Sequence, residues 1–120
     1  MSFNRGDVVL VPFPFTDLTT QKQRPALVVS SKDFNDSSSD AILLAITSQI
    51  PTESQPTDYQ LSSEGQRKAG LPRPSLVKAG KVVTLSQALV RKTVGRVPVE
   101  TVIESWKNSS LSSVSVNNET

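Results

Sequence analysis

Residues 5–30 read Arg-Gly-Asp-Val-Val-Leu-Val-Pro-Phe-Pro-Phe-Thr-Asp-Leu-Thr-Thr-Gln-Lys-Gln-Arg-Pro-Ala-Leu-Val-Val-Ser, and this stretch sets the pattern of the chain. The apolar run 8–13 predicts a strand, and the polar run 16–23 predicts a loop. The loop ends at Arg24-Pro25, where the apolar run 26–30 predicts a second strand. Arg24 is therefore expected where a loop meets a sheet, and such junctions combine access with a fixed position.

Short apolar runs of the same kind recur along most of the chain. Residues 41–47 are apolar on both faces, which predicts a central buried strand. Further strands are expected at 57–61, 75–77, 81–85 and 90–97, with a turn at Ala79-Gly80. Helical turns are expected at 31–35 and 86–89, and an irregular, mobile connection over 62–74. A helix is expected over 98–108, with an apolar stripe formed by Val99, Val102, Ile103 and Trp106.

These elements define the expected fold class. Five to seven short strands and one packed C-terminal helix predict a mainly β protein with a minor α part, built as a small curled sheet or barrel. The length of 120 residues suits one domain with a single modest core. We assign residues 1–110 to this domain and residues 111–120 to a flexible tail rich in Ser and Asn.

The composition excludes several kinds of chemistry. The chain has no cysteine and no histidine, so disulfides, thiolates, the commonest general base and the commonest metal ligand are all missing. We therefore predict no metal and no cofactor. No apolar run approaches the about 20 residues of a membrane span, and the N-terminus lacks a basic-then-apolar signal pattern. The expected location is the cytoplasm, without membrane contact.

The positive charges are concentrated in one part of the chain. The formal net charge is only +2, but eight basic residues fall within 67–96: Arg67, Lys68, Arg73, Lys78, Lys81, Arg91, Lys92 and Arg96. A basic face of this kind suits a polyanion such as nucleic acid, or an acidic protein. The alternative is a solvated face without a ligand.

Three motifs in order carry a family resemblance. They are Arg5-Gly6-Asp7-Val8, then 24–29 (Arg-Pro-Ala-Leu-Val-Val), then 46–49 (Ile-Thr-Ser-Gln), and the runs 74–78 and 81–85 support them. Together they resemble the MazF/PemK family of toxin endoribonucleases from type II toxin–antitoxin systems, over about residues 4–108. The resemblance implies an SH3-like barrel with a C-terminal helix, also found in CcdB-like proteins, and a cytoplasmic homodimer.

The resemblance also implies an activity and partners. It implies metal-independent, sequence-selective cleavage of single-stranded RNA, mainly mRNA, by attack of the 2′-hydroxyl, which gives 2′,3′-cyclic phosphate and 5′-hydroxyl ends and inhibits growth. A cognate antitoxin would block the RNA groove, and contact with DNA would occur only through that antitoxin. Arg24 and Thr47 match the catalytic arginine and threonine, while Ser48, Arg5, Phe15, Asp17 and Lys81 are candidates for substrate contacts.

Each of these residues also has an ordinary alternative. Arg24 can pair with Asp7 or Asp17, Thr47 can be a plain β-branched strand residue, and a lysine such as Lys81 can simply be solvated. The sequence departs from the family because residues 19–23 contain no carboxylate before Arg24, and no histidine is present. Two other functions therefore stay open: a catalytically weak or inactive homologue that binds RNA or antitoxin, and a CcdB-like toxin that poisons gyrase.

Overall fold

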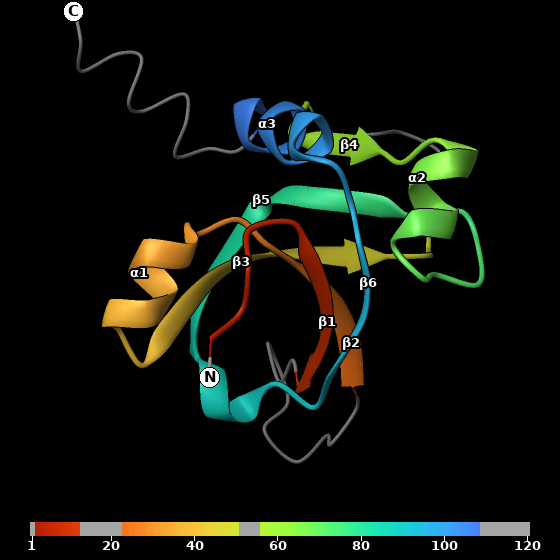
Figure 1. Ribbon diagram of the computed structural model, residues 1–120. Helices are drawn as coiled ribbons and strands as arrows, with labels where there is room; N and C mark the ends of the chain where they lie inside the picture. The colour runs from red at the N-terminus through yellow and green to blue at the C-terminus, as the bar shows by residue number, and fades with distance from the viewer. Residues whose placement is uncertain (1, 13–22, 51–55, 109–120) are drawn as a thin grey trace, which may run out of the picture.

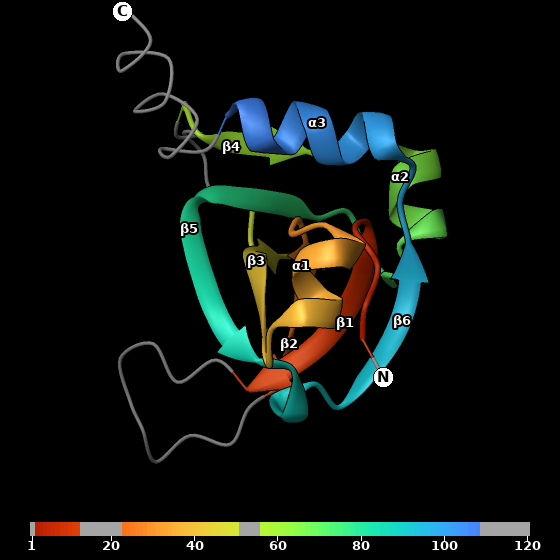
Figure 2. The ribbon, with the colours of Figure 1, turned by 60° about the vertical axis from the view of Figure 1, so that its left-hand side comes forward.

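The computed structural model describes residues 2–12, 23–50 and 56–108 (Figure 1). One antiparallel sheet dominates it, with the strand order β4-β5-β3-β2-β1-β6. The sheet curls strongly, and α3 lies across one end of the curled sheet, above β5 and beside β4 (Figure 2). The prediction of a mainly β fold with a curled sheet and a C-terminal helix is confirmed.

The first two strands, which the opening stretch predicts, pair with each other in an antiparallel arrangement. β1 spans Asp7–Pro12 and β2 spans Gln23–Val28, so β2 begins before Pro25 rather than after it. Pro25 lies opposite Leu10 of β1, whereas the pairing of β2 with β3 begins only at Ala26. The missing N–H of proline therefore removes no bond from the β2–β3 ladder, and Arg24 lies within the strand.

The buried strand at the centre is also confirmed. β3 spans Asp40–Thr47 and pairs with β2 on one side and with β5 on the other, while β4, Asp58–Gln60, is a short edge strand. Side chains alternate between the faces of the sheet, as strand geometry requires. In β1, Val8 joins one core cluster and Val9 joins the other.

The prediction of two strands around a turn at Ala79-Gly80 is wrong. β5 is one strand, Leu76–Ser86, which bends without reversing (Figure 2). Lys78 pairs with Ala45 and Val82 with Leu44, so residues 79–81 form a bulge without partners in β3. Such a bulge bends a strand and increases its twist. As a result, Val77 packs in one core cluster and Val83 packs against the other.

The prediction of an irregular connection over 62–74 is also wrong in its first half. α2 spans Ser63–Lys68, and the hydroxyl of Ser62 caps it by accepting from the N–H of Gly65 at 3.0 Å. Gly70 follows with φ of 73°. A Cβ there would lie 2.0 Å from the carbonyl oxygen of Val94, so only glycine allows β6, Lys92–Arg96, to approach so closely.

The predicted short helices are confirmed. α1 spans Lys32–Ser37, with the hydroxyl of Ser31 accepting from the N–H of Phe34 at 3.1 Å, and the 3₁₀ turn η1 spans Gln87–Leu89. The C-terminal helix α3 spans Val99–Lys107. Among the described residues, no helix has the length and apolar character needed to cross a membrane.

The predicted apolar stripe of α3 is only partly buried. Val102 is 3% exposed and belongs to the core, but Val99 and Ile103 are 55% and 48% exposed. The helix rests on the sheet through a narrow face that includes Val102 and the buried Ser105. The rest of the stripe faces a groove, described below. The expected tail, 111–120, lies outside the described residues.

Candidate nucleic-acid site

A polar cleft lies where β2 begins and β3 ends. It has a volume of about 430 Å³ and is bounded by the start of β2, by the residues that end and follow β3, and by the segment that leads from α2 into β5. Its polar lining residues are Gln23, Arg24, Thr47, Ser48, Gln49, Arg73 and Ser75. Three of the residues predicted from the sequence, Arg24, Thr47 and Ser48, therefore lie at one site.

The pairing of the strands explains why Arg24 and Thr47 meet. Ala26 of β2 lies opposite Ala45 of β3 in an antiparallel register. If this register is continued for two residues beyond the paired positions, Arg24 falls across from Thr47 on the same face of the sheet, which agrees with both residues lining one cleft. The two residues are 23 positions apart in the chain, so only the fold brings them together.

The Arg24 side chain is exposed. Among the residues that the structure describes, none forms an ion pair with it. The Asp7 carboxylate, one of the two alternatives for pairing, instead accepts from Nε of Arg96 at 3.0 Å and from the N–H of Asn4 at 2.9 Å. A guanidinium has five donors in a planar fork that matches two phosphate oxygens.

Thr47 holds its hydroxyl in a fixed place. Its Oγ1 accepts from the N–H of Gln49 at 3.1 Å, which closes the turn after β3. The hydroxyl hydrogen is free to be donated, since a hydroxyl has one donor and two acceptor positions. Thr47 is half-buried at the end of a rigid strand, and Ser48 beside it is exposed.

Arg73 is a cleft residue that the sequence did not single out. It was visible only as one of eight basic residues within 67–96, without a motif of its own. The structure brings it to the lining of the same cleft as Arg24, on the segment before β5. The others lie on or beside α2, β5 and β6. Ion pairs join Arg67 with Glu64, Lys78 with Asp58, and Arg96 with Asp7.

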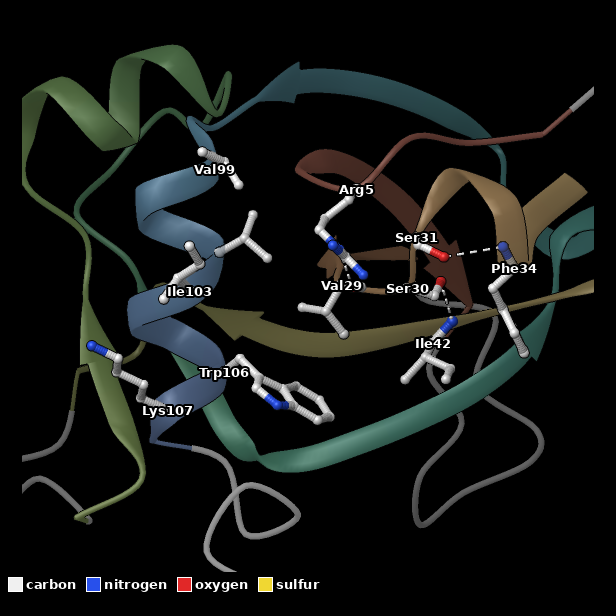
Figure 3. A pocket seen from close by; sticks show the side chains of 11 residues that line it. Arg5, Val29, Ser30, Ser31, Phe34, Ile42, Val99, Ile103, Trp106 and Lys107 are labelled. Atoms are coloured by element: carbon white, nitrogen blue, oxygen red, sulfur yellow. Dashed lines mark hydrogen bonds between the residues drawn. The ribbon is translucent and has the colours of Figure 1, made fainter. Parts of the chain in front are cut away.

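Arg5 lies in a different place. Its Nε donates to the carbonyl oxygen of Val29 at 2.9 Å. It lines an apolar groove of about 510 Å³ between α3 and the segment that joins β2 to α1 (Figure 3). Trp106 and Ile103 form one wall and Phe34 the other (Figure 3). The structure therefore does not bring Arg5 to the cleft, and its contact with a phosphate stays a prediction.

The remaining predicted residues are not at the cleft or not described. Lys81 is exposed within the bulge of β5 and interacts with another part of the protein. Phe15 and Asp17 lie outside the described residues. The alternative that Arg24 pairs with Asp17 therefore also falls outside them. Within the described ranges, no group of three or more carboxylates comes together in a way that could hold a metal ion.

Solved structures show the same fold. A mycobacterial endoribonuclease in complex with its cognate antitoxin is 18% identical to this chain, covering 92% of this chain and 93% of its own, with a TM-score of 0.71. MazF from Deinococcus radiodurans is 19% identical, with 90% and 93% covered and a TM-score of 0.71. The Mycobacterium tuberculosis toxin MazF-mt6 is 15% identical, with 85% and 93% covered and a TM-score of 0.64.

The sequence itself defines the class more closely. The family model of PemK-like, MazF-like toxins of type II toxin–antitoxin systems matches residues 4–105. No curated protein matches the sequence significantly. The match covers most of the chain, including β1, the cleft and nearly all of α3. The chain therefore belongs to the PemK/MazF toxin family, as its motifs predict.

Proposed function

We propose that this protein is the toxin of a type II toxin–antitoxin pair and cleaves single-stranded RNA, chiefly mRNA, at short sequences without a metal ion. One observation carries the proposal. Arg24 is exposed, has no ion-pair partner among the described residues, and lies in the same polar cleft as the fixed hydroxyl of Thr47. Family membership and the endoribonuclease structures of the same fold support it.

The proposed reaction uses the nucleophile that RNA already carries. The 2′-oxygen attacks the adjacent phosphorus, a bond from the 2′-oxygen to phosphorus forms, and the bond from phosphorus to the 5′-oxygen breaks. The 2′-hydroxyl loses its proton and the leaving 5′-oxygen gains one, so the products are a 2′,3′-cyclic phosphate and a 5′-hydroxyl. The protein has to align these atoms and to stabilise charge on the non-bridging oxygens.

Arg24 and Thr47 are suited to different parts of this task. Arg24 binds the non-bridging oxygens of the scissile phosphate and stabilises the charge that develops there. Arginine has a reference pKa of about 12.5–13.8, so it is a poor proton carrier, and its role is electrostatic. Thr47 donates its hydroxyl hydrogen to the phosphate, and Ser48 provides a second hydroxyl at the rim of the cleft.

The direct test is cleavage of a long single-stranded RNA by the purified protein in EDTA, followed by mapping of the new ends. We expect cuts at a recurring short sequence, with 5′-hydroxyl ends. An RNA with one 2′-deoxy nucleotide before the cut is the matched control, and it should resist cleavage. Cleavage of that control, 5′-phosphate ends, or no cleavage by the folded protein would each contradict the proposal.

We also propose a homodimer and a cognate antitoxin as the protein partners of this toxin in the cytoplasm. The apolar groove supports self-association, because exposed apolar side chains gather there: Val99 is 55%, Ile103 48% and Phe34 37% exposed. In a two-fold pair each copy presents the same patch. The antitoxin would act at the cleft, where it competes with RNA.

A further inference from the structure

We propose that Arg73 forms a second phosphate subsite in the cleft, for a phosphate that neighbours the scissile one on the same RNA strand. This inference rests on the proposed function and adds to it the way in which the RNA backbone is held. Arg73 lines the same cleft as Arg24 and is exposed. Among residues 2–12, 23–50 and 56–108 it has no ion-pair partner.

The backbone that carries Arg73 is fixed on its N-terminal side. The N–H of Leu71 donates to the carbonyl oxygen of Gln66 at 3.1 Å. The side-chain amide of Gln66 in turn donates to the carbonyl oxygen of Leu71 at 3.1 Å. Leu71 is buried and belongs to the core cluster beneath α3. The segment therefore leaves α2 at a defined point.

The C-terminal side is fixed as well. The hydroxyl of Ser75, which is 2% exposed, donates to the carbonyl oxygen of Arg73 at 2.9 Å. The carbonyl oxygen of Ser75 accepts from the N–H of Leu61 at 3.1 Å and from Nε2 of Gln60 at 3.3 Å. These bonds tie the segment to β4 just before β5 begins.

Two prolines restrict the positions between these anchors. Pro72 and Pro74 flank Arg73, and a proline fixes its own φ and restricts the residue before it to extended conformations. An exposed arginine on such a stiff segment loses little backbone entropy when it binds a ligand.

Arg24 and the start of β5, which follows Arg73, lie on opposite sides of Thr47. Leu76, at the start of β5, pairs with Thr47, which the register sets beside Arg24. Two strand spacings therefore separate the start of β5 from Arg24, or about 10 Å. An extended RNA strand that lies across the end of β3 can place one phosphate at Arg24 and another at Arg73. The ligand class is thus a polynucleotide with at least two phosphates rather than a single phosphate group.

The test uses an oligoribonucleotide that spans the mapped cut site and carries one 2′-deoxy nucleotide, so that it binds without being cleaved. Its affinity is measured over a range of salt concentrations for the wild type, Arg73→Ala and Arg73→Lys. Lys32→Ala is the control, because Lys32 precedes β3 on α1, at the end of that strand far from the cleft. It also removes one positive charge, although in the folded protein Lys32 is paired with Asp36.

We expect Arg73→Ala to weaken binding about tenfold, and to reduce the slope of log affinity against log salt by about 0.7, the value for one phosphate contact on a single strand. Arg73→Lys should restore the slope but only part of the affinity, because lysine lacks the planar fork. Lys32→Ala should change neither quantity by as much.

A neutral methylphosphonate placed in turn at each phosphate beside the cut locates the subsite. At one position it should weaken binding to the wild type and to Lys32→Ala, but not to Arg73→Ala, as expected for a coupled pair. Equal losses for the wild type and Arg73→Ala at every position would overturn the subsite, even if the wild type cleaves RNA normally. A wild type that neither binds nor cleaves RNA would instead reject the proposed function, and the subsite with it.

Discussion

The cleft and the apolar groove each contain an arginine from the family motifs, and the surroundings of the two arginines differ. Arg24 stands in a polar cleft without an ion-pair partner among the described residues. Arg5 lies among apolar side chains, and its Nε donates a hydrogen bond to the carbonyl oxygen of Val29. An unpaired cation among hydroxyls suits a phosphate, whereas a tethered cation in an apolar groove suits a protein surface.

From this contrast we infer that the two regions have different functions, and we call this the division between them. The cleft is proposed to carry the chemistry and the groove to carry self-association. The predictions below test this division, starting with the largest expected effect.

Replacing Arg24 should have the largest effect. At saturating RNA, Arg24→Ala should lower the single-turnover cleavage rate by about 100- to 1,000-fold, because the charge on the non-bridging oxygens loses its main partner. The side chain is exposed, so the free energy of unfolding should change by less than about 0.5 kcal/mol. Arg24→Lys should be intermediate. A variant that cleaves at the wild-type rate would exclude Arg24 from catalysis.

Replacing Thr47 should have a smaller effect on the same rate. Thr47→Val keeps the β-branched shape but removes the hydroxyl, so cleavage should fall about 10- to 100-fold, the range for one hydrogen bond to a charged group. Thr47→Ser keeps the hydroxyl and should recover most of the rate. If the serine variant is as slow as the valine variant, the hydroxyl is not the group through which Thr47 promotes cleavage.

The groove is tested through Ile103, which is 48% exposed in the single chain. Ile103→Asp places a charge on the proposed self-association surface and should raise the dimer dissociation constant about tenfold or more, as measured by sedimentation. Glu100→Ala, on the same helix, is a milder control. A dimer that is unaffected by Ile103→Asp would show that the groove is not the interface.

The smallest effect concerns α1, which carries Phe34 to the groove. Hydrogen bonds from Lys32 and Ser2 lower the pKa of Asp36. A lowered pKa in the folded state stabilises the protein above the ordinary pKa of about 3.9, and the contribution is lost as the pH falls through the lowered value. Asp36→Asn should therefore reduce the melting temperature slightly at about pH 7, and this deficit should shrink as the pH falls below the ordinary pKa of the carboxyl. A deficit that stays the same as the pH falls would contradict this assignment.

The sequence predicted the elements that follow from local pattern. Apolar runs, and the turn and loop residues that bound them, predict the strands around Arg24, the buried strand that ends at Thr47 and the C-terminal helix. It missed α2 because Gly65 lies inside that helix and lowers helix propensity, while the capping hydroxyl of Ser62 is a weak signal by itself.

The rest of the site depends on contacts between distant residues. The bulge at residues 79–81 is set by how β5 turns between two core clusters, which no local pattern indicates. Arg73 reaches the cleft because Gln66 and Ser75 hold the segment between α2 and β5. Arg5 was expected with Arg24 because the family motifs contain both, yet strand pairing separates them into two regions.

One experiment on two variants tests the division most directly. Arg24→Ala and Arg5→Ala are each assayed for single-turnover cleavage of RNA and for the dimer dissociation constant by sedimentation. The account predicts that Arg24→Ala loses cleavage and keeps the dimer, while Arg5→Ala weakens the dimer. Full cleavage by Arg24→Ala, together with loss of cleavage by an Arg5→Ala protein that is still dimeric, would contradict it, because the catalytic arginine would then lie in the groove.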